Sequence, residues 1–126
     1  MALFDTDIFI WVQRGNEKAA QLMEDDTERY LSIQTYMELL QCARDKKQHK
    51  QVKDFLAAFS FAILPLSEKI GHRAAVYVEE HSLSSNLRAG DALIAATAVE
   101  NNMILVSSNV KHFRVIKELS LTPFIP

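Results

Sequence analysis

Short hydrophobic runs alternate with stretches of helical periodicity along this chain. Four of these runs predict strands, at residues 2–5, 30–33, 61–66 and 103–106. The run at 103–106 is apolar throughout, which is typical of a central parallel strand that is covered on both faces. Residues 121–125 contain Pro123 and are expected to add an edge strand. The pattern favours an α/β fold with a mainly parallel sheet of four to five strands.

The segments between these strands repeat apolar residues every three or four positions, which predicts helices. Gly15 is expected to end the first helix, and Ser67 is a good N-cap for the helix that leads to about Leu83. Ser84–Asn86 is expected to be a loop. The helix at about 88–101 is apolar nearly all round, so it should be buried. The expected helices cover about 7–14, 17–26, Thr35 to Ala43, 52–59, 67–83 and 88–101.

Composition places the chain among ordinary globular proteins. It has 126 residues, of which 48% are hydrophobic and 24% charged, so one domain spanning residues 1–126 is expected. No apolar run approaches the ~20 residues of a membrane span, and the first residues lack a basic leader. The lone Cys42 cannot form an internal disulfide, which favours a reducing cytoplasm.

The net charge of −2 decides neither for nor against a nucleic-acid partner, because a site rich in carboxylates would mask a basic surface in the sum. Basic residues gather in two segments, at 44–53 and at 111–117. Either segment could contact phosphates. Solvated helix faces have the same composition, so both interpretations stay open.

Four polar residues share one position relative to the predicted elements. Asp5 ends the first strand, and Glu38 lies in the opening turn of the helix after the second. Asp91 opens the buried helix, and Asn109 follows the strand at 103–106. The carboxyl ends of parallel strands lie along one edge of a sheet, where ligand sites form. We therefore expect these four side chains to converge.

Each of the four also has a local structural explanation. Thr35-x-x-Glu38 reads as a capping box, in which Glu38 would reach back to the amide of Thr35. The other three have common roles in caps, helix macrodipoles and turns: Asp5 or Asp7 as a cap, Asp91 in a first helical turn and Asn109 in a turn.

Converging carboxylates repel one another, at about 4 kcal/mol per pair for a separation of ~4 Å and an effective dielectric near 20. Protons or cations must relieve this repulsion. Hard oxygen ligands suit Mg²⁺ or Mn²⁺, which bind through carboxylates, waters and substrate phosphates. Zinc is not favoured, because Cys42 and the four scattered histidines offer no paired ligands.

Four blocks of the sequence resemble, in order and along essentially the whole chain, the PIN-domain ribonucleases, and among them the VapC-type toxins of prokaryotic toxin–antitoxin pairs. The blocks are Phe4–Ile10, Thr35-x-x-Glu38-Leu39, Asp91–Ala98 and Leu105–Phe113. This resemblance implies a three-layer α/β/α fold and a Mg²⁺- or Mn²⁺-dependent endoribonuclease that hydrolyses RNA phosphodiester bonds. It also implies a homodimer and a cognate antitoxin whose peptide fills the active-site groove.

Carried over to this chain, the resemblance makes Asp5 and Asp91 the principal metal ligands and Glu38 the third acid. Ser107 takes the place of a small hydroxyl residue. Asn109 stands where many members have a fourth Asp, and it is expected to orient water or phosphate. Three carboxylates favour one metal at rest, with a second arriving with RNA.

Two other classes of function remain open at this point. A PIN-like domain could act as a catalytically inactive RNA-binding or scaffold module, since fold does not fix function. A phosphoacceptor signalling domain would need a Lys at a later strand end, and Ser107-Ser108-Asn109 offers none. The sequence does not specify the RNA target, the cleavage sequence or the antitoxin.

Overall fold

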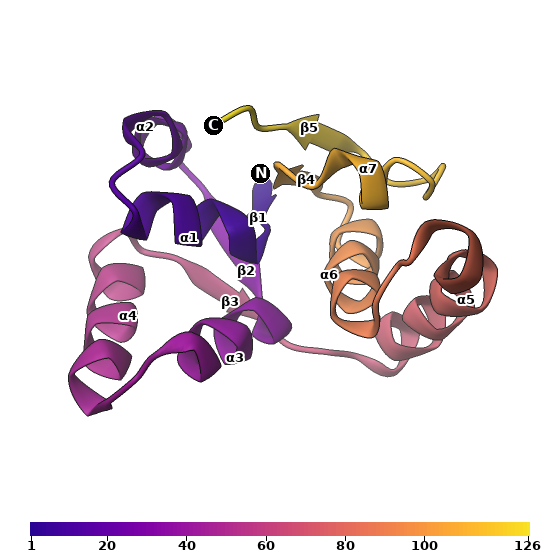
Figure 1. Cartoon of the computed structure of the whole chain (residues 1–126), viewed down its shortest axis with the longest axis horizontal. Coiled ribbons are helices and arrows are strands. Elements are labelled where there is room, and N and C mark those ends of the chain that lie inside the picture. Colours follow the sequence, from indigo (N-terminus) through magenta and orange to yellow (C-terminus); the bar gives the residue numbers. More distant parts are fainter.

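The computed structural model describes all residues, 1–126, and is built on one five-stranded sheet (Figure 1). The strand order is β3-β2-β1-β4-β5, and every neighbouring pair is parallel, which confirms the predicted fold class. The Pro123 strand lies at an edge, as expected. The strands are β1 (Ala2–Phe4), β2 (Arg29–Ser32), β3 (Ala62–Leu64), β4 (Ile104–Ser107) and β5 (Leu121–Pro123).

Seven helices cover the two faces of the sheet and complete a three-layer arrangement (Figure 1). One face carries α1 (Thr6–Gln13), α2 (Glu17–Asp25), α3 (Ile33–Cys42) and α4 (Lys46–Ala58). The other face carries α5 (Glu68–Ser85), α6 (Ala89–Glu100) and α7 (Val110–Phe113). None of the helices combines the length and apolarity needed to cross a membrane.

Side chains of the central strands alternate between two hydrophobic cores. Leu3 of β1 packs with α5 and α6, whereas its neighbours Ala2 and Phe4 pack with α1 to α4. Leu105 and Val106 of β4 divide in the same way. This follows from the two-residue period of a strand, and it explains why Ala2–Phe4 and Ile104–Val106 are apolar without interruption.

Helix α6 is the most deeply buried helix of the chain, as its sequence predicts. Ala92, Ala95, Ala96 and Ala98 are fully buried, and α5 packs along it. Small side chains allow this close approach to the sheet and to α5. The first turn of α6 is thereby fixed at the carboxyl edge of the sheet.

The start of α3 differs from the sequence expectation. The helix begins at Ile33 rather than Thr35, because Ser32 is its N-cap and its hydroxyl accepts a hydrogen bond from the Gln34 amide at 3.1 Å. Thr35 is buried within the helix, and Glu38 lies in its second turn rather than its opening turn. The expected capping box is therefore wrong.

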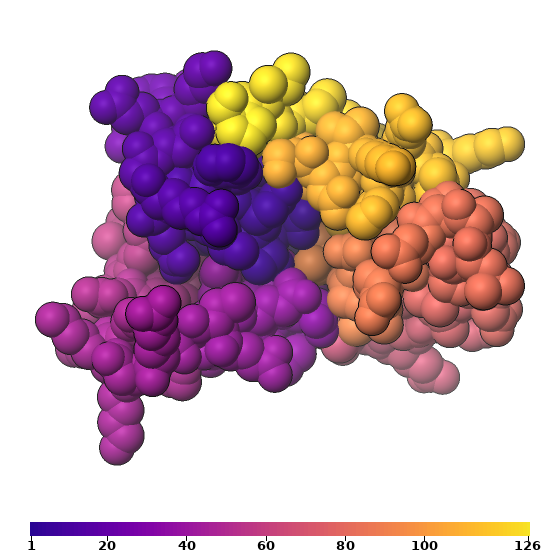
Figure 2. Space-filling view, in the orientation of Figure 1, coloured from indigo at the N-terminus to yellow at the C-terminus, as the bar shows by residue number.

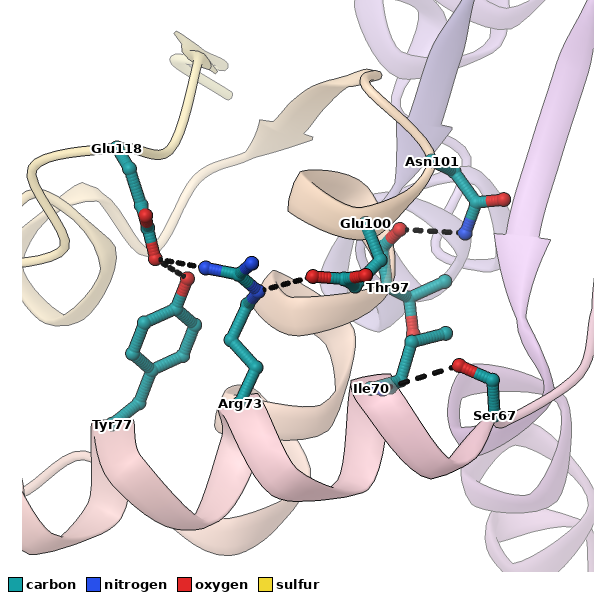
Figure 3. A network of polar contacts seen from close by, with 8 residues as sticks. All are labelled: Ser67, Ile70, Arg73, Tyr77, Thr97, Glu100, Asn101 and Glu118. Atoms are coloured by element: carbon teal, nitrogen blue, oxygen red, sulfur yellow. Dashed lines mark hydrogen bonds and ion pairs between the residues drawn. The ribbon is translucent and has the colours of Figure 1, made fainter.

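Two further segments differ at their ends. Ser84 and Ser85 complete α5 rather than forming a loop, and Asn86 ends the helix in the left-handed conformation with φ of 54°. Asn tolerates this conformation better than most residues. The short helix α7 was not expected. Ser67 caps α5 as predicted, accepting from the Ile70 amide at 3.1 Å (Figure 3).

Candidate active site

The four predicted site residues line one open cleft of about 670 Å³ at the carboxyl edge of the sheet. Figure 2 shows that the N-terminal segment, α3 and the α6–α7 region meet on one face of the molecule. The cleft is lined by Asp5, Thr6, Asp7, Ile10, Glu38, Gln41, Cys42, Asp91, Ser108 and Asn109.

Asp5 is fixed between β1 and β4 and is only 5% exposed. Its carboxylate accepts hydrogen bonds from the Thr6 amide at 2.8 Å and from the Ser107 hydroxyl at 2.7 Å. Burial raises the pKa of Asp5 to about 8, and the negative charges of Asp7 and Asp91 add to this, against the effect of the two hydrogen bonds. Near neutral pH this carboxyl therefore carries a proton unless a cation replaces it.

Asp91 lies in the first turn of α6 and is half-buried. Burial is the main cause that raises its pKa, and the charges of Glu38 and Asp7 contribute further. A hydrogen bond from the Arg88 backbone and the charge of His112 act in the opposite direction. Two carboxyl groups of the cleft thus hold protons more tightly than free carboxyls do.

Glu38 is held by contacts other than those its sequence pattern suggested. The Thr6 hydroxyl donates to Glu38 Oε1, and the Gln34 side-chain amide donates to Glu38 Oε2 at 3.3 Å. The hydroxyls of Thr6 and Thr35 lie 3.0 Å apart. The Glu38 carboxylate is therefore turned toward α1 and the cleft instead of back to the start of its own helix.

Asp7 is a candidate site residue that the sequence reasoning considered only as a cap. Its Oδ2 accepts hydrogen bonds from the amide of Ser108, at 3.0 Å, and from the Ser108 hydroxyl. Its Oδ1 is buried and has no hydrogen-bond partner. The signal was the spacing: a residue two positions after Asp5 lies in the first turn of α1, at the same sheet edge.

Asn109 contacts a residue on either side of it in the chain, Ser107 and His112. Its amide N–H donates to the Ser107 hydroxyl oxygen at 2.9 Å, and its side-chain nitrogen lies 3.0 Å from His112 Nδ1. Ser107 therefore links Asp5 to Asn109 through one hydroxyl. His112 is placed beside the cleft by α7, which the sequence pattern did not reveal.

The donor set of the cleft fits a hard divalent cation. No Lys or Arg forms a salt bridge with Asp5, Asp7, Glu38 or Asp91. As they lie, no three carboxylate, imidazole or thiolate groups are close enough together to hold a metal, so the expected convergence is incomplete. The orphaned Oδ1 of Asp7 is a buried ligand atom without a partner. Oxygen donors with no competing cation suit Mg²⁺ or Mn²⁺.

Comparison with known proteins identifies the family of this chain. The family model "PIN domain" matches residues 2–119. The chain is 32% identical over 123 residues to ribonuclease VapC10 of Mycobacterium tuberculosis, covering 94% of this chain and 90% of that protein. It superposes on a toxin–antitoxin complex from Klebsiella pneumoniae with a TM-score of 0.82, 30% identity and full coverage of both chains. VapBC-1 of nontypeable Haemophilus influenzae shares the fold, with a TM-score of 0.80, 21% identity and coverage of 97% and 96%.

The chain belongs to the PIN-domain family. Within that family its likeness extends to a VapC ribonuclease over nearly its whole length, and the resemblance drawn from the four sequence blocks is confirmed.

Proposed function

We propose that this protein is a Mg²⁺- or Mn²⁺-dependent endoribonuclease and the toxin of a VapBC-type toxin–antitoxin pair. The observation that carries the proposal is a cleft lined by four carboxylates, of which Asp5 is buried and the others partly buried, with no Lys or Arg paired to any of them. Such an arrangement destabilises the metal-free fold, so a structural role alone does not explain it. Membership of the PIN-domain family supports the nuclease chemistry.

In this mechanism Asp5 and Asp91 are the principal ligands, and Glu38 is the third acid. A divalent cation, when bound, supplies a water of lowered pKa and neutralises charge on the scissile phosphate. The Asp5 carboxyl, with its pKa of about 8, gives up its proton when it becomes a ligand. Thr6 and Ser107 hold the ligand carboxylates in place through their hydroxyls.

Two further residues of the cleft have separate roles. The side-chain amide of Asn109 can donate to a phosphate oxygen or to the attacking water, because it is a neutral donor among carboxylates. Asp7 is available as an additional oxygen ligand through Oδ1. Its Oδ2 stays bound to Ser108, so the loop after β4 and the first turn of α1 keep their relative positions.

Cleavage of RNA by the purified protein tests this function. Labelled single-stranded and structured RNAs are incubated with Mg²⁺, with Mn²⁺ or with EDTA, and an Asp5→Asn variant purified in parallel controls for contaminating nucleases. The proposal expects cleavage only with metal and only by the wild type. Equal cleavage by the variant, or cleavage in EDTA, would contradict it.

A second candidate is an RNA-binding or scaffold module with the same fold. The incomplete gathering of the carboxylates favours this alternative. It expects RNA to bind and remain uncut under every metal condition. A gel-shift measurement on the same labelled RNAs reports binding, and together with the cleavage assay it separates the two functions.

The antitoxin is the partner that the fold neighbours suggest for this chain, since several are toxin–antitoxin complexes. An apolar groove of about 480 Å³ lies between α1, α3 and α4. Cys42 lines both this groove and the carboxylate cleft, so the two adjoin at this residue. We propose that an apolar antitoxin segment occupies the groove and reaches the cleft from there. The groove is lined mainly by Phe9, Val12, Leu39, Val52, Phe55 and Leu56.

Coexpression with the protein encoded by the neighbouring reading frame tests the groove. The substitution Gln51→Trp would fill it from its polar side, with Gln21→Trp on the exposed face of α2 as the matched control. We expect loss of copurification only for Gln51→Trp. Unchanged copurification of both variants would place the antitoxin elsewhere.

A homodimer and a cytoplasmic location remain predictions from the family resemblance and the cysteine content. Light scattering coupled to size exclusion measures the first. A mass near twice 14.3 kDa supports it, whereas a mass near 14.3 kDa contradicts it.

A further inference from the structure

Gly90, the second residue of α6, lies directly against the side chains of α3 that approach the cleft. A Cβ atom built on Gly90 would lie 2.9 Å from Oε2 of Glu38 and 3.1 Å from Nε2 of Gln34. The first distance is shorter than real Cβ atoms show, and the second is tighter than nine in ten real Cβ contacts. The backbone of α6 therefore lies so close to Glu38 that any larger residue at position 90 would take the space of its carboxylate.

We propose that Gly90 is a positioning residue for Glu38: its missing side chain leaves the space in which the Glu38 carboxylate stands beside the first turn of α6. Asp91 follows Gly90 directly, and Glu38 and Asp91 both line the cleft. The inference rests on the proposed metal-dependent function.

The atoms that a new Cβ would meet decide what the substitution does. Both belong to the far ends of flexible side chains, and neither is backbone. These ends can swing aside, so the fold should absorb the change at little cost in stability. One of them is Oε2 of Glu38, a carboxylate of the proposed metal site, however. The carboxylate is held there by the Thr6 hydroxyl at Oε1 and by the Gln34 side-chain amide at Oε2. A small structural change thus becomes a functional one.

Gly71 provides a matched control within the same chain. It lies inside α5, and a Cβ built there meets nothing within 4 Å. Gly→Ala substitutions in helices favour folding where space allows, because Ala has the higher helix propensity. Gly71→Ala and Gly90→Ala therefore make the same chemical change in a helix and differ in whether a carboxylate lies in the way.

The experiment measures Mn²⁺ affinity by titration calorimetry and RNA cleavage for wild type, Gly71→Ala, Gly90→Ala, Glu38→Ala and the double variant Gly90→Ala/Glu38→Ala. We expect Gly90→Ala to weaken Mn²⁺ binding about 10- to 100-fold, the range typical of residues that orient metal ligands. Gly71→Ala should change nothing. In the Glu38→Ala background Gly90→Ala should have no further effect, since the displaced group is gone.

Three results would overturn the inference. One is wild-type Mn²⁺ affinity in Gly90→Ala. Another is the same fold-loss in the Glu38→Ala background, which would mean that Gly90 acts through some other group. The third is a fall of more than a few degrees in the melting temperature of Gly90→Ala, because the inference requires side-chain ends to absorb the clash.

A crystal structure of metal-free Gly90→Ala separates this inference from the proposed function. We expect the Glu38 carboxylate to be displaced from the position 3.3 Å from the Gln34 amide. If the wild type binds no Mn²⁺, the proposed function fails, while the position of Glu38 still decides the inference. An unmoved carboxylate would overturn it whatever the metal does.

Discussion

Acidic side chains gather at two places in this fold, and the difference between them explains the site. Away from the cleft, Arg73 of α5 donates to Glu100 at 2.5 Å and to Glu118 at 2.7 Å, and the Tyr77 hydroxyl also donates to Glu118 (Figure 3). The carboxylates of the cleft have no such cation. One cluster shares a cation within the chain, and the other requires a proton or a metal from outside.

The pKa directions express the same contrast. The hydrogen bond from Tyr77 and the contact with Arg73 lower the pKa of Glu118. Burial raises the pKa of Asp5 and of Asp91. The first cluster favours the charged form of Glu118 and connects α5, α6 and the segment after α7. The second resists charge, as a site kept for a cation does.

Neutralising a single acid of the cleft should have the largest effect. Asp5→Asn or Asp91→Asn should reduce metal-dependent RNA cleavage by at least about 100-fold, because each removes a principal ligand. The fold should persist, since a source of repulsion is removed. Circular dichroism and cleavage rates check this, with Glu118→Gln as the control that leaves cleavage unchanged. Normal cleavage by either variant would show that the site is wrongly assigned.

The stability of the metal-free protein should depend on pH through Asp5 of the cleft. The pKa of Asp5 lies higher in the folded protein than the usual 3.8, so the folded state binds the proton more tightly than the unfolded state. Unfolding free energy of the metal-free protein should therefore fall as pH rises from about 4 to about 8, by on the order of a few kcal/mol.

Urea denaturation at pH 5 and pH 8 measures this trend. Asp5→Asn should flatten it, and Mn²⁺ should restore stability at pH 8 more than at pH 5. A metal-free protein that is more stable at pH 8 than at pH 5 would contradict the proposed repulsion.

Removing the Ser107 hydroxyl should have a smaller effect. Ser107→Ala removes the bond to the Asp5 carboxylate and the acceptor for the Asn109 amide. We expect a loss of about 1–2 kcal/mol in unfolding free energy and roughly tenfold slower cleavage. Ser107→Thr keeps a hydroxyl and serves as the partner variant. Identical loss in both would assign the effect to packing instead.

Removing Arg73, which pairs with Glu100 and Glu118, should have the smallest effect. Arg73→Ala should lower the unfolding free energy by about 1 kcal/mol, since Arg73 is partly exposed and water screens its ion pairs. Cleavage per folded molecule should be unchanged. Slower cleavage by the folded variant would mean that the two clusters are coupled.

The sequence predicted the parts of this structure that local pattern controls. Apolar strands, the all-apolar α6 and the Ser67 cap are each fixed by residues within a few positions. The sheet edge on which Asp5 and Asp91 would meet followed from the expected parallel arrangement of the strands.

The errors arose where distant residues compete with local ones. Ser32 took the cap that Thr35 was expected to form, because Thr35 is buried against Thr6. Glu38 then bonds to Thr6, which lies 32 positions away. Asp7 contacts Ser108, and Gly90 lies against Glu38. Both contacts join residues far apart in the chain, so the periodicity of the sequence does not predict them.

The central claim is that a cation replaces the proton on Asp5. Titration of the metal-free protein with Mn²⁺ at pH 7, in two buffers of different ionisation enthalpy, counts the protons released. We expect one bound Mn²⁺ with close to one proton released, and the loss of both in Asp5→Asn. Binding that releases no proton and persists in Asp5→Asn would contradict it.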